Sequence, residues 1–186
     1  MSYPLYAATM TTTWNGTPVD VAEQTYLEIE HRPAGVLLDF TTPFYNDPPP
    51  PLLPEADIVS TPELWNYEVV ELFIKHAHSE QYTEMELGPH GNYLVLRLNG
   101  VRQRVSEGHP LRYKSYLEAG HWMGTALLEH AHLPPRPWVF NAYRIHGTEP
   151  GRRYLSLFSQ PATDDAPDFH RLETFKSLEF GPSPTP

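Results

Sequence analysis

Proline and glycine interrupt this chain at short intervals, and that spacing limits the regular structure that the chain can form. The sequence holds 21 Pro and 11 Gly among its 186 residues. Short segments rich in Val, Ile, Leu, Phe and Tyr lie between them, a pattern typical of strands joined by turns. No stretch of a dozen residues keeps an apolar spacing of three and four, so we expect no long amphipathic helix.

The apolar segments have the length and composition of β-strands. Nine segments fit this description, and a tenth extended piece follows near the end of the chain. Nine or ten strands with few helices predict an all-β fold, a two-sheet antiparallel β-sandwich. The expected strands are Thr25–His31, Val36–Thr41, Glu68–His76, Gln81–Leu87, Tyr93–Asn99, Tyr113–Glu118, Trp122–Glu129, Trp138–Ile145 and Tyr154–Ser159, and the tenth is Thr174–Phe180.

The length of the chain indicates a single domain. We expect that domain to span residues 1–180 and the tail, residues 181–186, to be disordered. Pro43–Pro54 includes four consecutive prolines, which cannot donate backbone hydrogen bonds, so we expect a stiff surface loop or a lid leading toward Trp65. The acidic segment Pro161–Asp168 also has the composition of a loop.

Composition excludes some chemistry and disfavours several partners. The chain has no cysteine, which excludes disulfides and zinc sites built on thiolates. A formal net charge of −10 argues against nucleic acid or an anionic membrane as the main partner. The N-terminus lacks the features of a secretory signal, and no apolar run approaches the ~20 residues of a membrane span. We therefore expect a cytoplasmic protein without a cofactor.

Residues 82–99 predict a hairpin with one polar face. Side chains alternate in Tyr82–Leu87 and again in Tyr93–Asn99, and a Gly-Pro-His-Gly-Asn turn joins the two segments. We expect the three leucines of the second strand to face the core, and one allowed register places Glu84 opposite Arg97. The polar face has two interpretations: a solvated surface with a cross-strand ion pair, or a ligand surface with aromatic rings and charged groups.

The strand expected before this hairpin carries a carboxylate in an otherwise apolar sequence. Alternation places Glu71 on one face with Val69 and Phe73, so Glu71 is expected to be largely buried. A buried carboxylate costs free energy unless it is paired or hydrogen-bonded. Arg97 or Arg144 would satisfy it structurally, whereas an open cleft with a ligand hydroxyl is the functional alternative.

Three stretches of the chain resemble the carbohydrate-binding-module family 9-like (DOMON-like) group of β-sandwiches. The first is LWNYEVVELFI at 64–74, followed by a Tyr-x-Glu-x-Glu strand and a Gly-Pro-x-Gly turn. The second runs from Trp122 through Leu133-Pro134 to WVFNAYRI at 138–145, and the third is PDFHRL at 167–172 with the apolar piece behind it. The likeness covers about residues 24–180 and is greatest to a branch that keeps the LW-x-YEVVE and GPHG patterns.

The resemblance implies a jelly-roll-like sandwich that binds a saccharide or a similar polyhydroxylated molecule. Well-described members clamp a sugar between two tryptophans, while polar side chains meet its hydroxyls. No second tryptophan is assigned here, because Trp122 and Trp138 occupy core-like positions. The binding residues carried over by position are Trp65, Glu71, Glu84, Glu86, Arg97 and Asn141, and no residue is assigned as catalytic.

Two other functions stay open at this point. Glu71 with Glu84 or Glu86 would form the carboxylate pair of a hydrolase or lyase acting on glycan-like substrates. Alternatively, the domain would be a scaffold that binds protein through an exposed sheet edge or the proline loop.

Two pairs of histidines are candidate metal ligands. His76/His78 and His130/His132 form two His-Ala-His pairs, and on a strand each pair would share a face. Neither pair has an obvious third ligand, so we predict no metal site.

Overall fold

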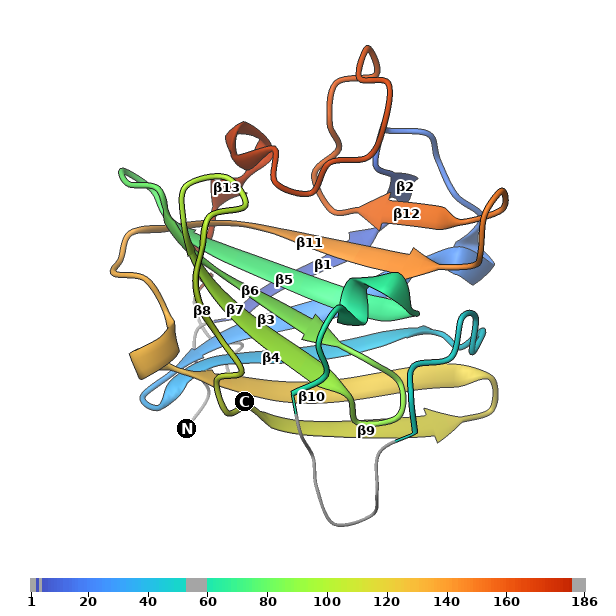
Figure 1. Ribbon diagram of the computed structural model, residues 1–186, viewed down its shortest axis with the longest axis horizontal. Coiled ribbons are helices and arrows are strands. Elements are labelled where there is room, and N and C mark those ends of the chain that lie inside the picture. Colours follow the sequence, from blue (N-terminus) through green and yellow to red (C-terminus); the bar gives the residue numbers. More distant parts are fainter. Residues whose placement is uncertain (1–2, 4, 53–59, 182–186) are drawn as a thin grey trace.

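The computed structural model describes Tyr3, residues 5–52 and residues 60–181 as two antiparallel sheets packed face to face (Figure 1). This confirms the all-β, two-sheet antiparallel sandwich. The helical segments in the described part of the chain are four single 3-10 turns: η1 (Val21–Glu23), η2 (Leu64–Asn66), η3 (His130–His132) and η4 (Leu172–Thr174). None of them is long and apolar enough to cross a membrane.

The smaller sheet has five strands in the order β1-β3-β4-β10-β9. Its strands are β1 (Leu5–Met10), β3 (Thr25–Arg32), β4 (Gly35–Pro43), β10 (His121–Glu129) and β9 (Arg112–Glu118).

The larger sheet has eight strands, seven of them in the order β2-β12-β11-β5-β6-β7-β8, with β13 pairing β11. Its strands are β2 (Thr12–Thr13), β12 (Arg153–Ser156), β11 (Trp138–His146), β5 (Val69–His76), β6 (Gln81–Leu87), β7 (Tyr93–Asn99), β8 (Arg104–Glu107) and β13 (Lys176–Ser177).

All nine segments with a clear strand pattern form strands, with small shifts at their ends. The tenth segment, Thr174–Phe180, was largely wrong as a strand. Only Lys176–Ser177 pairs with β11, and Thr174 is the last residue of η4. Three strands were missed, namely β1, β2 and β8. They lack an apolar alternation: β1 is LYAATM, β2 has two residues and β8 reads RVSE.

The main core lies between the two sheets. Alternate side chains of β5, namely Val70, Leu72 and Ile74, face Leu27 and Ile29 across this core. The opposite face of the same strand is buried too, since Phe73 is fully inaccessible. Burial on both faces explains why β5 reads as a nearly continuous apolar run.

A second apolar layer covers the outer face of the eight-stranded sheet. Leu94, Leu96 and Leu98 of β7 lie in this layer, together with Leu64 of η2 and Phe175 near the C-terminus. The expectation that these leucines face the core between the sheets was therefore wrong. The reason is that the neighbouring positions of β6 and β7 are apolar as well: Met85, Leu87, Tyr93 and Val95 supply the inner face.

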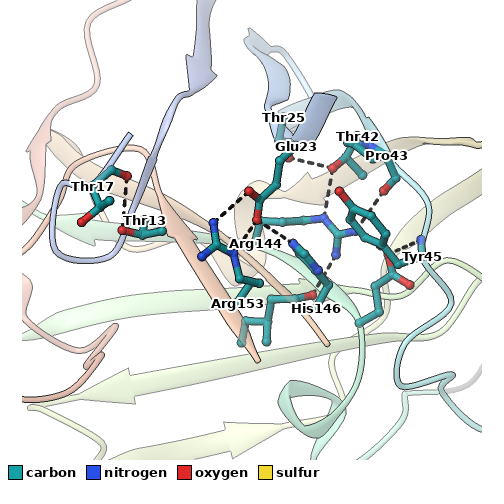
Figure 2. Close-up of polar contacts among 12 residues, drawn as sticks. Thr13, Thr17, Glu23, Thr25, Thr42, Pro43, Tyr45, Arg144, His146 and Arg153 are labelled. Atoms are coloured by element: carbon teal, nitrogen blue, oxygen red, sulfur yellow. Dashed lines mark hydrogen bonds and ion pairs between the residues drawn. The ribbon is translucent and has the colours of Figure 1, made fainter. Parts of the chain in front are cut away.

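A buried charged pair joins the two sheets at one end of the sandwich, and Figure 2 shows its arginine, Arg144, beside Thr42 and Pro43 of the other sheet. Arg144 of β11 is 1% exposed and pairs with Glu68, which is fully buried. The guanidinium also donates to Thr42 Oγ1 at 3.0 Å and to the Pro43 carbonyl at 3.0 Å in the other sheet. Glu68 accepts two further backbone N–H bonds, from Tyr45 and Asp47. Arg144 is thus committed to Glu68 and does not pair with Glu71.

The described part of the proline loop is fastened beside this charged pair. The Glu68 N–H donates to the Pro48 carbonyl, and Asn92 Nδ2 donates to the Pro51 carbonyl at 2.9 Å. The end of the predicted loop, residues 53–54, lies outside the described residues, as does most of the predicted tail, 182–186. Gly181 pairs with Leu5, so the tail that was predicted to be disordered begins with a paired residue.

Candidate functional site

A cleft of about 470 Å³ opens on the outer face of the eight-stranded sheet. Its floor comes from β5, β6 and β7, and its walls come from η2, the β7–β8 connection, the start of β12 and the segment before η4. The lining residues are Trp65, Asn66, Glu71, Phe73, Glu84, Leu96, Leu98, Arg102, Arg104, Ile145, Glu149, Arg152, Tyr154, Pro167, Phe169 and His170.

Three carboxyl groups gather at the floor of this cleft on two adjacent strands. Glu71 of β5 lies directly opposite Glu86 of β6, and Glu84 lies two residues along β6 on the same face. Their exposed fractions are 2%, 0% and 4%. Glu71 and Glu84 line the cleft. The predicted burial of Glu71 is confirmed, but its charged neighbours are two more glutamates and Arg152 rather than Arg97 or Arg144.

Burial raises the pKa of all three carboxyl groups, and repulsion between glutamates adds to the rise for Glu71 and Glu86. Burial raises the pKa of Glu84 to about 7, although Glu86 and the arginines at 102 and 104 oppose the rise. Burial, followed by the charge of Glu84, places the pKa of Glu71 well above its usual range, and the charge of Arg152 opposes this. The pKa of Glu86 rises for the same reasons, since it is buried beside the other two glutamates. At neutral pH the floor of the cleft therefore carries less negative charge than three ordinary glutamates would.

Several of these carboxyl oxygens lack a hydrogen-bond partner. Oε2 of Glu84 and both oxygens of Glu86 are buried and accept no hydrogen bond from any described residue other than the contact between these two carboxyl groups themselves. The backbone N–H of Trp65 lies near the Glu86 carboxyl but outside hydrogen-bonding geometry. Unsatisfied buried polar atoms are rare in native proteins and call for an explanation such as a bound molecule.

A short polar chain leads into the cleft beside Glu84. The backbone N–H of Arg102 donates to the Tyr82 hydroxyl at 3.1 Å, and that hydroxyl lies 2.7 Å from His170 Nδ1. Burial lowers the pKa of His170 to about 4, so the imidazole is neutral at pH 7. When the Tyr82 hydroxyl donates its hydrogen bond to Nδ1, the neutral imidazole carries its own proton on Nε2. This Nε2 atom lies 3.8 Å from Glu84 Oε2. That distance is too long for a direct hydrogen bond and leaves both atoms available to a ligand.

Aromatic side chains form two of the walls. Trp65 of η2 is half-buried and packs against the outer apolar layer. Phe169 stacks on Tyr143 with ring centroids 3.9 Å apart and meets Tyr154 edge-on at 6.1 Å. Trp65, Tyr154 and Phe169 all line the cleft, and they supply the aromatic surface for which no second tryptophan could be assigned.

The structure brings three of the six predicted binding residues to the cleft surface, namely Trp65, Glu71 and Glu84. Glu86 belongs to the same carboxyl cluster beneath them. Arg97 does not reach the cleft. It pairs with Thr83 in the strand register, while Glu84 pairs with Leu96, so the expected placement of Glu84 opposite Arg97 was wrong. The sequence allowed several registers, and the structure adopts one in which Arg97 is exposed on the other face.

Asn141 is also placed away from the cleft, in a structural position. It is fully buried, and its amide group donates to Tyr143 Oη at 2.9 Å and to the Phe158 carbonyl at 2.8 Å. Its side-chain oxygen accepts from the backbone N–H groups of Ala142 and Phe158. Asn141 therefore fixes the segment after β12 against β11.

Sequence reasoning missed the arginines and His170 of this cleft. Arg102 and Arg104 lie in and after the β7–β8 connection, and Arg152 comes just before β12. Only tertiary contacts bring these positions together. The PDFHRL stretch carries part of the resemblance to the family 9-like fold. It contains Phe169 and His170, but the resemblance assigned no role to either residue.

The histidine pairs do not converge on a common point. His130 and His132 lie in the 3-10 turn η3 rather than on a strand. His130 contacts His31 edge-on at 5.5 Å, whereas His132 packs on His109 at 4.7 Å. Within residues 5–52 and 60–181, no group of three or more His, Asp or Glu side chains is arranged to hold a metal ion.

Comparison with known proteins finds close relatives in sequence. The chain is 40% identical over 172 residues to the UPF0462 protein C4orf33 homolog of Danio rerio, covering 89% of this chain and 85% of that protein. It is 39% identical over 172 residues to the UPF0462 protein C4orf33 of Homo sapiens, covering 90% of this chain and 85% of the human protein. No model of a protein family matches the chain.

Two solved structures share the fold at low sequence identity. One is from Bacteroides uniformis ATCC 8492 and is described as a candidate carbohydrate-binding protein; its TM-score is 0.70 at 14% identity, covering 93% of this chain and 85% of that chain. The other is a carbohydrate binding module family 9 from Caldicellulosiruptor kristjanssonii in complex with glucose, with a TM-score of 0.54 at 11% identity, covering 89% of this chain and 81% of that chain. The predicted resemblance to a family 9-like β-sandwich is therefore confirmed at the level of fold.

Proposed function

The chain belongs to the UPF0462 family, and we propose that its outer cleft binds a saccharide or a similar polyhydroxylated small molecule. The observation that carries the proposal is the unpartnered carboxyl oxygen of Glu84, which is buried at the floor of a 470 Å³ cleft with Trp65 in its wall. A buried polar atom without a partner costs free energy, and a ligand hydroxyl would remove that cost.

The composition of the cleft suits a sugar. Carboxyl groups and the neutral imidazole of His170 offer both donors and acceptors to hydroxyl groups, while Trp65 and Phe169 offer flat apolar surface to a sugar ring. Ligand sites in proteins combine apolar and aromatic walls with a few well-placed polar groups in this way. Two proteins of the same fold, one described as a candidate carbohydrate-binding protein and one in complex with glucose, support the same class of ligand.

A thermal-shift and calorimetry screen tests the proposal. Monosaccharides and short oligosaccharides are added to the wild-type protein and to Trp65→Ala. A ligand that binds the folded state raises the melting temperature by mass action. We expect a saccharide-dependent shift in the wild type that Trp65→Ala abolishes, because that variant removes one wall of the cleft.

Tyr116→Ala is the matched control. Tyr116 is 54% exposed on β9 of the other sheet, so this variant truncates an aromatic residue far from the cleft. It should keep the wild-type response. A saccharide response that survives in Trp65→Ala would refute the assignment of the cleft, and a screen without any response would refute saccharide binding.

One specific observation supports a second candidate, a hydrolase or lyase that acts on a glycan-like substrate. The cleft places carboxyl groups with raised pKa values on adjacent strands, and a carboxyl group that stays protonated near pH 7 is what a general acid requires. This candidate predicts that Glu71→Gln abolishes turnover while saccharide binding persists. If wild-type protein releases no product from a broad glycan panel, the binding function stands alone.

A further inference from the structure

The positive charges of the cleft differ in how they are neutralised. Arg102 pairs with Asp168 at 2.7 Å, and Arg104 pairs with Glu107. Arg152 lines the same cleft, yet among the described residues it forms no ion pair with any carboxylate. It is therefore the cation of the cleft that no neighbouring carboxylate pairs at close range, and its guanidinium lies over the Tyr154 ring at 5.6 Å.

The hydrogen bonds of Arg152 leave most of its donors unused. The guanidinium donates to the carbonyl of Trp65 at 2.6 Å and to the carbonyl of Asn66 at 3.0 Å. A guanidinium has five N–H donors, so these two bonds leave three, and the Nε–H is buried without an acceptor. The two bonds to η2 also fix the position of Arg152 beside Trp65, so the charge is held in place before any ligand arrives.

The acidic residues nearby do not cancel this charge. Burial, followed by the charge of Glu84 and opposed by that of Arg152, places the pKa of Glu71 well above its usual range, so this carboxyl carries less negative charge than an ordinary glutamate. Burial likewise raises the pKa of Glu84 to about 7. Glu149, the remaining carboxylate of the lining, accepts a hydrogen bond from the Tyr154 hydroxyl at 3.4 Å. The cleft thus combines carboxyl groups of raised pKa at its floor with an arginine at its wall that forms no ion pair among the described residues.

We propose that the ligand of the cleft is an anionic saccharide, one that bears a carboxylate or a phosphate group, and that Arg152 binds this group. The inference rests on the proposed function and narrows its ligand class. Guanidinium groups bind carboxylate and phosphate through paired, charge-assisted hydrogen bonds. The sugar ring would lie against Trp65, while its hydroxyls meet Glu71 and Glu84.

Calorimetry with matched ligands tests the inference. Glucose is compared with glucuronate and with glucose 6-phosphate, and the galactose and mannose series are treated in the same way. We expect at least one anionic form to bind about tenfold more tightly than its neutral parent, as a charge-assisted pair implies. Added salt should weaken binding of the anion and leave the neutral sugar unchanged. Whichever anionic form binds identifies whether the group is a carboxylate or a phosphate.

Variants of Arg152 separate ligand binding from a structural role. Arg152→Gln should reduce the affinity for the anion to that for the neutral sugar, and Arg152→Lys should retain part of the preference. Arg112→Gln, on an exposed arginine of β9 in the other sheet, removes the same charge and should change neither affinity. If Arg152→Gln and Arg152→Lys lower the affinity for neutral and anionic sugars equally, Arg152 only supports η2 and the inference is overturned.

The outcomes distinguish this inference from the proposed function. Equal binding of neutral and anionic sugars would overturn the role of Arg152 and leave saccharide binding intact. Absence of binding by every sugar, neutral or anionic, would overturn both. A preference for the anion that Arg152→Gln removes would support both.

Discussion

At the scale of single residues, the defining feature of this protein is a cluster of three buried glutamates without a cation to match each of them. Glu71, Glu84 and Glu86 lie side by side on β5 and β6, and burial raises the pKa of each, with repulsion between glutamates adding to the rise for Glu71 and Glu86. Such a cluster costs folding free energy whenever its members ionise. A site for polyhydroxylated ligands explains why the chain would keep it.

The raised pKa of Glu84 lowers the free energy of unfolding as the pH rises. The ordinary value is 4.5, and the folded value is about 7. Between pH 4.5 and pH 7 the folded state binds more protons than the unfolded state. The contribution of Glu84 to the free energy of unfolding is therefore fully present below pH 4.5 and is lost as the pH rises to 7. The loss is on the order of 3 kcal/mol.

Glu84→Gln isolates this effect from the histidines. His146 and His170 act in the opposite sense, because burial lowers each pKa to about 4 and their contribution is lost as pH falls from 6.5 to 4. We expect Glu84→Gln to gain stability relative to wild type as pH rises from 5 to 8, measured by urea unfolding. Glu129→Gln, an exposed carboxyl on β10, is the matched control. Parallel curves for wild type and Glu84→Gln would contradict the prediction.

At the scale of elements, β10 and β4 pack so closely that one position admits no side chain. A Cβ atom on Gly124 of β10 would lie 2.3 Å from Cε1 and Cζ of Phe40, its partner in the register. Phe40 in turn meets Trp122 edge-on at 5.0 Å, so its ring has little freedom to move. Glycine in this strand is therefore a packing requirement.

Substitution of this glycine should destabilise the fold by overpacking. Gly124→Ala is expected to lower the free energy of unfolding by about 1–3 kcal/mol, measured by urea denaturation. The double variant with Phe40→Leu removes the clashing ring atoms, so its loss should be smaller than the sum of the two single losses. Strictly additive losses would show that the contact with Phe40 is not the cause.

At the scale of the whole molecule, the charged pair of Arg144 and Glu68 ties the two sheets and the proline loop together. The arginine lies on β11 and donates across the interface to Thr42 and to the Pro43 carbonyl, while Glu68 holds the backbone of the loop. Loss of one partner of a buried pair leaves an uncompensated charge, which is far more costly than loss of both.

Glu68→Gln should therefore lower the free energy of unfolding by about 3–5 kcal/mol. The double variant Glu68→Gln with Arg144→Met removes both charges and should recover part of this loss. Glu129→Gln breaks the exposed pair with Arg112 and should cost less than about 1 kcal/mol. A loss for Glu68→Gln no larger than that of Glu129→Gln in urea unfolding would show that the buried pair does not hold the sheets together.

Local patterns in the chain were enough to predict the β-sandwich, because strand alternation and turn chemistry depend on residues that are near one another in sequence. All nine clearly patterned strands formed, and the burial of Glu71 was predicted correctly from alternation in β5 alone. The resemblance added the family 9-like fold, which the structural comparisons confirm. Weakly patterned strands such as β1 and β8 escaped prediction because their pairing depends on neighbours rather than on their own composition.

The residues that form the cleft come together only through tertiary contacts. Both faces of β7 carry apolar side chains, so the sequence could not say which leucines face the core between the sheets, and the register of the folded sheet places Arg97 outside the cleft. Arg102, Arg152 and His170 are distant in sequence and meet only because η2 and the segment before η4 fold over the outer face of the sheet. Long-range packing of this kind leaves no periodic signal in the chain, and that is the physical reason why the fold could be predicted and the site only in part.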